Sequence, residues 1–412
     1  ARASKKTASG TFRITLSFAA GAPRSEAWPR IRASSTASAP SSISYTPLSR
    51  RVALSGLTML LAVSLVANIM LRRWILALLP FALLGALMHL PSESSVESTL
   101  RYTLVQPLLK QSEINDASKF EQQFARIAAL TVPGQNQSRI VLWPESAIPD
   151  YLEDGYPERY YRQVTAGADP EFARKRIGRV IGPHSTLLSG VVNLDIGTRE
   201  DGSRGAVSAR NSVIALNGAG EITHQYAKAH LVPYGEYLPM RPILEPLGLS
   251  RLVAGSIDYQ RARAHRTIDL GEHGKVGVQI CYEIVFSGEV TDPANRPDFL
   301  FNPSNDGWFG SWGSPQFVGQ ARMRAIEEGL PVIRSTTTGI SAVIDAGGIV
   351  RGVIGTGKAD KLDGFVPAAK PPTLFAQWGH RLTLGWAALF LLLGLGQRWF
   401  GPRVLALIRA RG

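Results

Sequence analysis

The sequence of 412 residues predicts an α/β domain joined to transmembrane helices. Short runs of Val, Ile and Leu bounded by Gly, Pro or Asn recur through the middle of the chain, as β-strands require. Among them, the segment 314–329 has apolar residues at helical spacing and ends on Gly329, a residue suited to a helix C-cap. Long uncharged apolar runs flank this region and predict the membrane-spanning part.

The predicted strands are almost continuously apolar, which is typical of a sheet that is covered on both faces. Between two of them, "NGAGE" (217–221) is a hairpin turn signal. We expect strands at 138–143, 185–192, 211–216, 275–280, 298–303, 330–336 and 341–346.

Three apolar runs are candidates for membrane spans. The runs 52–71 and 74–90 are separated by Arg72 and Arg73, and a third run covers 382–396. Helices buried in a protein core are the alternative, but the first run offers no polar face. We therefore expect two transmembrane helices within 52–90 and a C-terminal one at 381–400.

Arginines set the expected orientation. Arg72 and Arg73, and the arginine-rich tail after the third run, belong in the cytoplasm by the positive-inside rule. The middle segment, 98–372, then lies on the opposite side, which is the periplasm in a bacterium. Residues 1–51 are basic, rich in Ser, Ala and Pro, and begin with Ala. We expect them to be poorly structured and not native, with an incomplete N-terminal membrane region.

Composition excludes several classes of protein. The net charge of +13 fits an anionic membrane surface better than nucleic acid, because no basic run carries interleaved aromatics. A single cysteine, Cys281, excludes an intramolecular disulfide framework and zinc sites built on several cysteines. We expect no cofactor and no metal.

Polar residues at the ends of predicted strands are the candidates for a site, because α/β proteins bind ligands there. Glu145 follows one strand, Lys228 and Glu236 lie in "YAKAHLVPYGEYLP", and Cys281 ends another strand. Each has an ordinary structural explanation: a helix cap, a surface charge, or a small buried hydrophobe in the case of Cys281. Together they supply a base, a cation and a thiol.

Several motifs carry a resemblance to a known family. They are "WPESAIP", "KAHLVPYGEYLP", "ICYEIVF", "NPSNDGWFG" followed by "QARMRAIEEG", and "TTTGISAVID". In this order they resemble the carbon–nitrogen hydrolase (nitrilase) superfamily, and within it the apolipoprotein N-acyltransferase family. The resemblance runs from about Leu104 to Asp345.

The resemblance implies a four-layer αββα sandwich with a catalytic Glu145, Lys228 and Cys281. It implies supporting roles for Glu236, Tyr282 and Glu283. It also implies a bacterial inner-membrane enzyme of lipoprotein biosynthesis, with a phospholipid acyl donor and an apolipoprotein acceptor. Three positions depart from the family pattern: Phe317, Leu330 and Thr337. A further departure is at the front, where the family has more membrane spans.

The residues themselves suggest the chemistry. A thiolate is the effective form of a cysteine nucleophile, and a nearby cation such as Lys228 would lower its pKa. Glu145 could take the thiol proton, and Lys228 could stabilise the oxyanion formed by attack on an acyl ester. An acyl thioester at Cys281 would then pass to an amine or to water. A membrane-tethered amidase or nitrilase is therefore the alternative enzyme, and a non-enzymatic membrane scaffold is the third possibility.

Overall fold

The computed structural model describes residues 96–133, 137–199, 201–248, 258–262 and 267–385, and isolated positions at 63–82 and 387–395. Residues 1–51 and most of the spans expected at 52–90 and 381–400 lie outside the described residues. Within the described part, no helix combines the length and apolar character needed to cross a bilayer.

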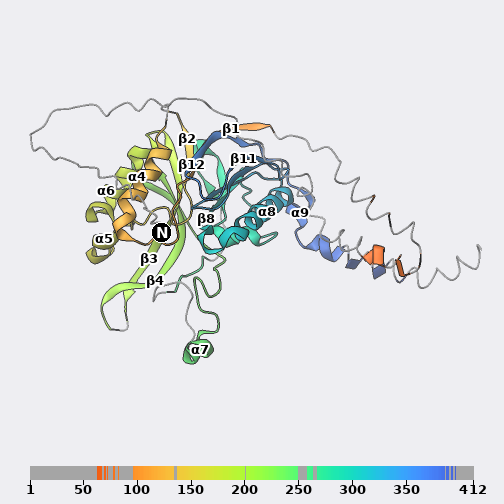
Figure 1. Ribbon diagram of the computed structural model, residues 1–412, viewed down its shortest axis with the longest axis horizontal. Coiled ribbons are helices and arrows are strands. Elements are labelled where there is room, and N and C mark those ends of the chain that lie inside the picture. Colours follow the sequence, from red (N-terminus) through yellow and green to blue (C-terminus); the bar gives the residue numbers. More distant parts are fainter. Residues whose placement is uncertain are drawn as a thin grey trace, which may run out of the picture. The chain divides into compact units, whose positions relative to one another are not determined.

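In the described part of the chain, twelve strands form two six-stranded sheets (Figure 1). The first sheet has the order β12-β1-β2-β3-β4-β5 and the second has the order β11-β10-β9-β8-β7-β6. The strand bounds in the first sheet are β1 Glu97–Gln106, β2 Arg139–Leu142, β3 Ser185–Thr198, β4 Arg204–Asn217, β5 Ile222–Ala227 and β12 Asp360–Pro367. Those in the second are β6 Thr267–Asp269, β7 Lys275–Val278, β8 Phe299–Ser304, β9 Val332–Thr336, β10 Ser341–Ile344 and β11 Val350–Ile354.

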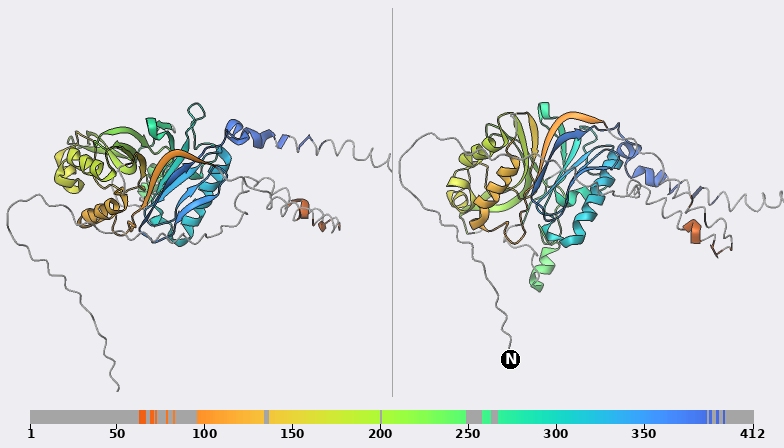
Figure 2. Two further views of the ribbon diagram at one scale, coloured as in Figure 1. Left: turned by 90° about the horizontal axis from the view of Figure 1, so that it is seen from above. Right: turned by 45° about the horizontal axis from the view of Figure 1, so that its top comes forward.

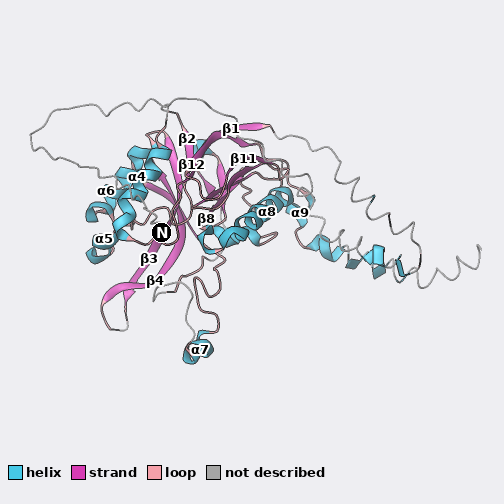
Figure 3. Cartoon of the chain, in the orientation of Figure 1, coloured by secondary structure: helices cyan, strands magenta, loops and turns pink. Residues whose placement is uncertain are grey.

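Helices cover the outer face of each sheet, whereas the short helix α7 (Arg241–Leu244) lies at the end of a loop away from both (Figures 1 and 3). The α-helices are α4 Phe120–Thr131, α5 Glu158–Val164, α6 Pro170–Ile181, α7 Arg241–Leu244, α8 Gly310–Glu328 and α9 Leu374–Trp378. The 3₁₀ helices are η2 Ala117–Lys119, η3 Ala166–Ala168, η4 Glu245–Leu247, η5 Gly271–His273, η6 Cys281–Val285 and η7 Asp306–Trp308.

Three apolar clusters define four layers. The central cluster joins side chains of both sheets, such as Leu142 of β2 and Phe301 of β8, so the two sheets pack face to face. A second cluster joins the outer face of the first sheet to α4 and α6, through Ile127 and Ile177. A third joins the outer face of the second sheet to α8, through Ala321. The expected αββα sandwich is present in the described residues, and its transmembrane part is not described.

Most predicted elements are confirmed. Each expected strand overlaps an observed one, the turn at 217–221 joins antiparallel β4 and β5, and Gly329 caps α8 with a φ of 66°. One detail differs: β7 ends at Val278, so Cys281 begins η6 instead of ending a strand. The ranges predicted from the sequence do not include β1, β5, β6, β11 or β12. Of these, β1 and β12 lie far apart in the chain and pair antiparallel (Figure 2).

A close backbone contact fixes the turn after β2. A Cβ atom placed on Gly190 of β3 would lie 2.6 Å from the Cα of Glu145 and 2.8 Å from the backbone N of Ser146. Only glycine leaves room there, because real side chains do not approach backbone atoms so closely. The main-chain N–H of Gly190 also donates to the carbonyl of Pro144, at 3.2 Å. Glu145 is therefore held against β3 by backbone contacts.

We expect Gly190→Ala to lower the free energy of unfolding by about 1–3 kcal/mol, because the added methyl must push the backbone at Glu145 away. Gly355→Ala is the control, since a Cβ there meets nothing within 4 Å. Its effect should stay within about 0.5 kcal/mol. Denaturant unfolding of the full chain in detergent measures both, and equal midpoints for the two variants would contradict the close contact.

Candidate active site

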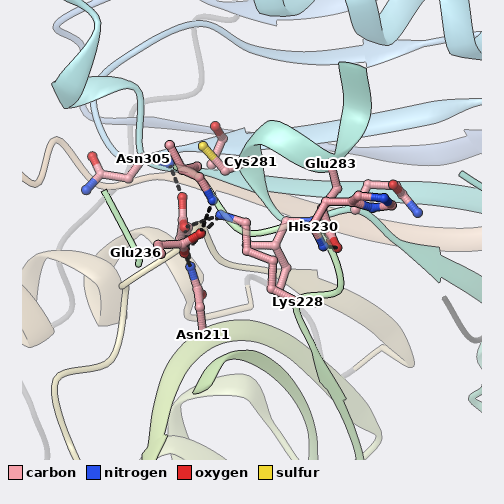
Figure 4. A network of polar contacts seen from close by, with 12 residues as sticks. Asn211, Lys228, His230, Glu236, Cys281, Glu283 and Asn305 are labelled. Carbon is pink, nitrogen blue, oxygen red and sulfur yellow. Dashed lines mark hydrogen bonds and ion pairs between the residues drawn. The ribbon is translucent and has the colours of Figure 1, made fainter. Parts of the chain in front are cut away.

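Four segments bring the predicted residues together (Figure 4). Glu145 follows β2, Lys228 follows β5, Glu236 lies in the loop after Lys228, and Cys281 begins η6. The first three come from the first sheet and its loops, whereas Cys281 comes from the second. The face-to-face packing of the two sheets therefore assembles the cluster.

Glu145 is buried, and both of its carboxylate oxygens accept hydrogen bonds. The side-chain amide of Asn211, on β4, donates to Oε1 at 2.7 Å. The main-chain N–H of Asn305 donates to Oε2 at 2.7 Å. Ser146, the next residue, has a φ of 55°, so the chain turns sharply just after the carboxylate. These contacts fix the orientation of the Glu145 side chain.

Lys228 is a fully buried ammonium between two carboxylates. Its Nζ donates to Glu236 Oε1 at 3.0 Å and lies 3.9 Å from Glu145 Oε1, beyond hydrogen-bonding distance. Burial by itself lowers the pKa of Lys228, but the charges of Glu145 and Glu236 outweigh it, and the net pKa is raised. The ammonium is therefore charged at neutral pH, hydrogen-bonded to Glu236 and ion-paired with Glu145.

Glu236 holds the lysine in place. Its Oε1 accepts from Lys228 and, at 2.8 Å, from the amide of Asn211. Its Oε2 accepts from the main-chain N–H of Val232 at 2.8 Å. The carboxylate thus ties its own loop to Lys228.

Cys281 is buried, and its backbone is left-handed, with a φ of 50°. Burial, and then the charge of Glu145, raise the pKa of its thiol to about 12, although Lys228 and a hydrogen bond with Ser304 lower it. Lys228 thus lowers the pKa as the sequence analysis expected, but its effect is outweighed. The resting thiol is neutral and needs a base to become a nucleophile.

Glu283 joins the turn at Cys281 to the turn after Lys228. It is fully buried, and its carboxylate accepts from the main-chain N–H groups of Ile280 (2.7 Å), Ala229 (2.6 Å) and His230 (3.1 Å). The hydroxyl of Tyr226 donates to it at 3.0 Å. Tyr282, the remaining supporting candidate, is half-buried and packs edge-on against Phe286, with ring centroids 5.1 Å apart.

Sequence reasoning missed a polar layer beneath the site. Arg334 and Asp306 form a completely buried ion pair, and Arg334 also donates to Asn302 Oδ1. The amide of Asn302 in turn donates to the carbonyl of Cys281 at 3.3 Å. The signal was available in "NPSND", where several polar residues interrupt an apolar strand.

The three residues that depart from the family pattern each contact identified neighbours. The Phe317 ring lies 5.2 Å from the guanidinium carbon of Arg334. The Thr337 hydroxyl donates to Asn305 Oδ1 at 2.9 Å, and Leu330 is buried in the cluster under α8. All three are accommodated by their neighbours.

Comparison with known proteins gives the family of the chain. The sequence model of the carbon–nitrogen hydrolase family matches residues 104–360, and the chain belongs to this family. It is similar to the apolipoprotein N-acyltransferase of Bradyrhizobium diazoefficiens, with 33% identity over 78% of this chain and 58% of that protein. The protein of the same name from Sinorhizobium medicae is 35% identical over 69% of this chain and 51% of its own length. The chain thus spans little more than half the length of these curated relatives.

Solved structures are more distant. A carbon–nitrogen hydrolase superfamily protein of Xanthomonas campestris aligns with a TM-score of 0.41 and 17% identity, over 69% of this chain and 94% of its own. An amidase from Nesterenkonia aligns with a TM-score of 0.44 and 16% identity, over 70% of this chain and 99% of its own.

The environment of Glu283 predicts a dependence of stability on pH. Burial raises its pKa from 4.5 to about 7, although its hydrogen bonds lower it. Because the folded-state pKa is the higher one, this contribution to stability is complete below about pH 4.5 and is lost as the pH rises through about 7.

The stability difference between wild type and Glu283→Gln should therefore shift against the wild type between about pH 5 and about pH 8. Denaturant unfolding of both chains at the two pH values measures it. Glu158→Gln, which changes an exposed carboxylate paired with Arg162, should show no such trend. A stability difference that moves in favour of the wild type as the pH rises would contradict the raised pKa of Glu283.

Proposed function

We propose that this chain is an acyltransferase that moves an acyl chain from a phospholipid to the N-terminal amine of an apolipoprotein, through a thioester at Cys281. The observation that carries the proposal is the placement of the only cysteine of the sequence, with a left-handed backbone, at the polar cluster that holds Lys228 and Glu236 (Figure 4). The name of the curated relatives supports the choice of acceptor.

Thiol activation is the first step. Glu145 takes the proton of the Cys281 thiol. The hydrogen bond from the main-chain N–H of Asn305 orients the Glu145 carboxylate and supports this role. The raised pKa of the thiol means that proton removal and attack are coupled, since a free thiolate is scarce at neutral pH. Glu236 is the poorer candidate for this base, because the Lys228 ammonium donates a charge-assisted hydrogen bond to it at 3.0 Å but lies 3.9 Å from Glu145.

Acyl transfer to sulfur is the second step. The sulfur forms a bond to the ester carbonyl carbon, and the carbonyl oxygen becomes an oxyanion. Lys228 and the main-chain N–H of Tyr282 donate to this oxygen, and one such donor is worth about 2.7–4 kcal/mol. The C–O bond then breaks, and the lysophospholipid leaves with the proton held by Glu145.

Transfer to nitrogen completes the cycle. The acceptor amine attacks the thioester carbonyl and loses a proton to Glu145 as the C–N bond forms. The C–S bond breaks, and the sulfur regains that proton from Glu145. Water in place of the amine would give a hydrolase, the alternative reading of the same residues.

Membrane placement belongs to the same proposal. We infer that 98–372 is a catalytic domain on the periplasmic side of a bacterial inner membrane, tethered by spans within 52–90 and 381–400. The apolar character of these runs supports it.

The proposal predicts a covalent intermediate. The full chain in phospholipid–detergent micelles should gain one acyl mass, and Cys281→Ser should gain none, because a serine hydroxyl is not ionised here. A peptide with a diacylglyceryl-cysteine N-terminus should remove the acyl group and become N-acylated. Intact mass spectrometry follows both steps. Release only as free fatty acid would support the hydrolase, and acylation of the serine variant would refute Cys281 as nucleophile.

Glu145→Gln should prevent thioester formation, because an amide cannot accept the thiol proton. We expect a loss of about 10²–10⁴-fold in the acylation rate. Glu236→Gln should also slow acylation, through a misplaced Lys228. The matched control is Glu153→Gln, a carboxylate that binds Asn193 and Gln225 away from this cluster. A normal rate for Glu145→Gln would assign the base to another group.

A further inference from the structure

Asn211 forms hydrogen bonds with all three charged residues of the cluster, Glu145, Lys228 and Glu236. It lies on β4 beside the end of β5, and its main-chain carbonyl accepts from the N–H of Lys228 at 2.8 Å. Its side-chain amide donates to Glu145 Oε1 at 2.7 Å and to Glu236 Oε1 at 2.8 Å. One residue thus holds the lysine by its backbone and both carboxylates by its side chain.

The orientation of this amide is unambiguous. Both partners are carboxylate oxygens, which accept hydrogen bonds, so the NH₂ group must face them. The two oxygens that it contacts are also the two that face the Lys228 ammonium, at 3.9 Å and 3.0 Å. Figure 4 shows Asn211 below Glu236 and Lys228, on the side away from Cys281.

The contact of the Asn211 amide with both carboxylates matters because the two carboxylates carry like charges. Buried Glu145 and half-buried Glu236 share the nearby Lys228 ammonium, and their like charges repel each other. The Asn211 amide donates to both carboxylates and so opposes their separation. The base that the proposed function requires is the carboxylate form of Glu145.

We propose that Asn211 is a positioning residue that keeps Glu145 ionised and aimed at the thiol, and that sets its separation from Glu236. This inference rests on the proposed function and deepens it. Asn211 acts through Glu145 and Glu236 and does not itself touch the reacting atoms.

The test uses Cys281 as the only thiol of the full chain in detergent. Its alkylation by iodoacetamide, followed by intact mass between about pH 5 and about pH 9, needs no acyl donor. Asn211→Ala should lower the plateau rate by about tenfold and move the acid limb of the profile to higher pH, because a carboxylate without its donor binds a proton more readily. Asn211→Asp keeps the shape of the side chain but offers no hydrogen-bond donor. Its alkylation rate should fall by about a hundredfold.

Asn193→Asp is the matched control. Asn193 lies on neighbouring β3, is buried where Asn211 is half-buried, and donates to the carboxylate of Glu153 at 2.7 Å outside the site. Its profile should match the wild type, and thermal unfolding checks that all four chains fold. If the Ala variant does not fold, the isosteric Asp variant decides.

Identical profiles for all four chains, including no reaction in any of them, would overturn the role of Asn211. So would an Asp variant that reacts like the wild type, since shape alone would then suffice. Phospholipid-dependent acylation of the wild type is measured separately. Its absence would refute the proposed donor and leave the alkylation result standing.

Discussion

The buried ammonium of Lys228 is the constraint on which the rest of the site depends. An ion taken out of water costs several kcal/mol unless partners compensate, and removing one partner of a buried pair typically costs about 3–5 kcal/mol. Compensation here requires Glu145 and Glu236 at fixed distances. Those distances in turn fix the end of β2, the loop after β5 and the inward-facing side of β4 at Asn211. The same contacts that stabilise the buried ammonium therefore also set the geometry of the site.

The packing of the two sheets also fixes the position of the nucleophile relative to Lys228, Glu145 and Glu236. Cys281 belongs to the central cluster between the sheets, together with Leu142 and Val278. Glu283 ties the same turn to the backbone after Lys228. A displacement of about 1 Å between reacting groups can cost 10²-fold in rate. The apolar core and the Glu283 contacts together fix the position of the thiol relative to Glu145 and Lys228, which belong to the other sheet.

Much of the fold was predictable because the central strands are short, apolar and bounded by clear turns. Glu145, Lys228 and Cys281 were also accessible, since polar residues after buried strands are conspicuous. β1 and β12 were not, because both mix polar and apolar residues, and their pairing joins distant parts of the chain. The contacts of Asn211 were hidden for a similar reason. An asparagine at the start of an apolar run suggests a strand end, and only the folded chain brings two carboxylates to its amide.

The left-handed backbone at Cys281 limits which nucleophiles this position can hold. Such a φ is strongly disfavoured for β-branched residues, whose second branch crowds the main chain. Cysteine and serine share the same unbranched shape, so exchange of sulfur for oxygen leaves the turn undisturbed. Threonine, a nucleophile in other enzymes, would need a different turn first. Between a thiol and a hydroxyl nucleophile, this backbone therefore admits a change of one atom with the geometry of the chain held constant.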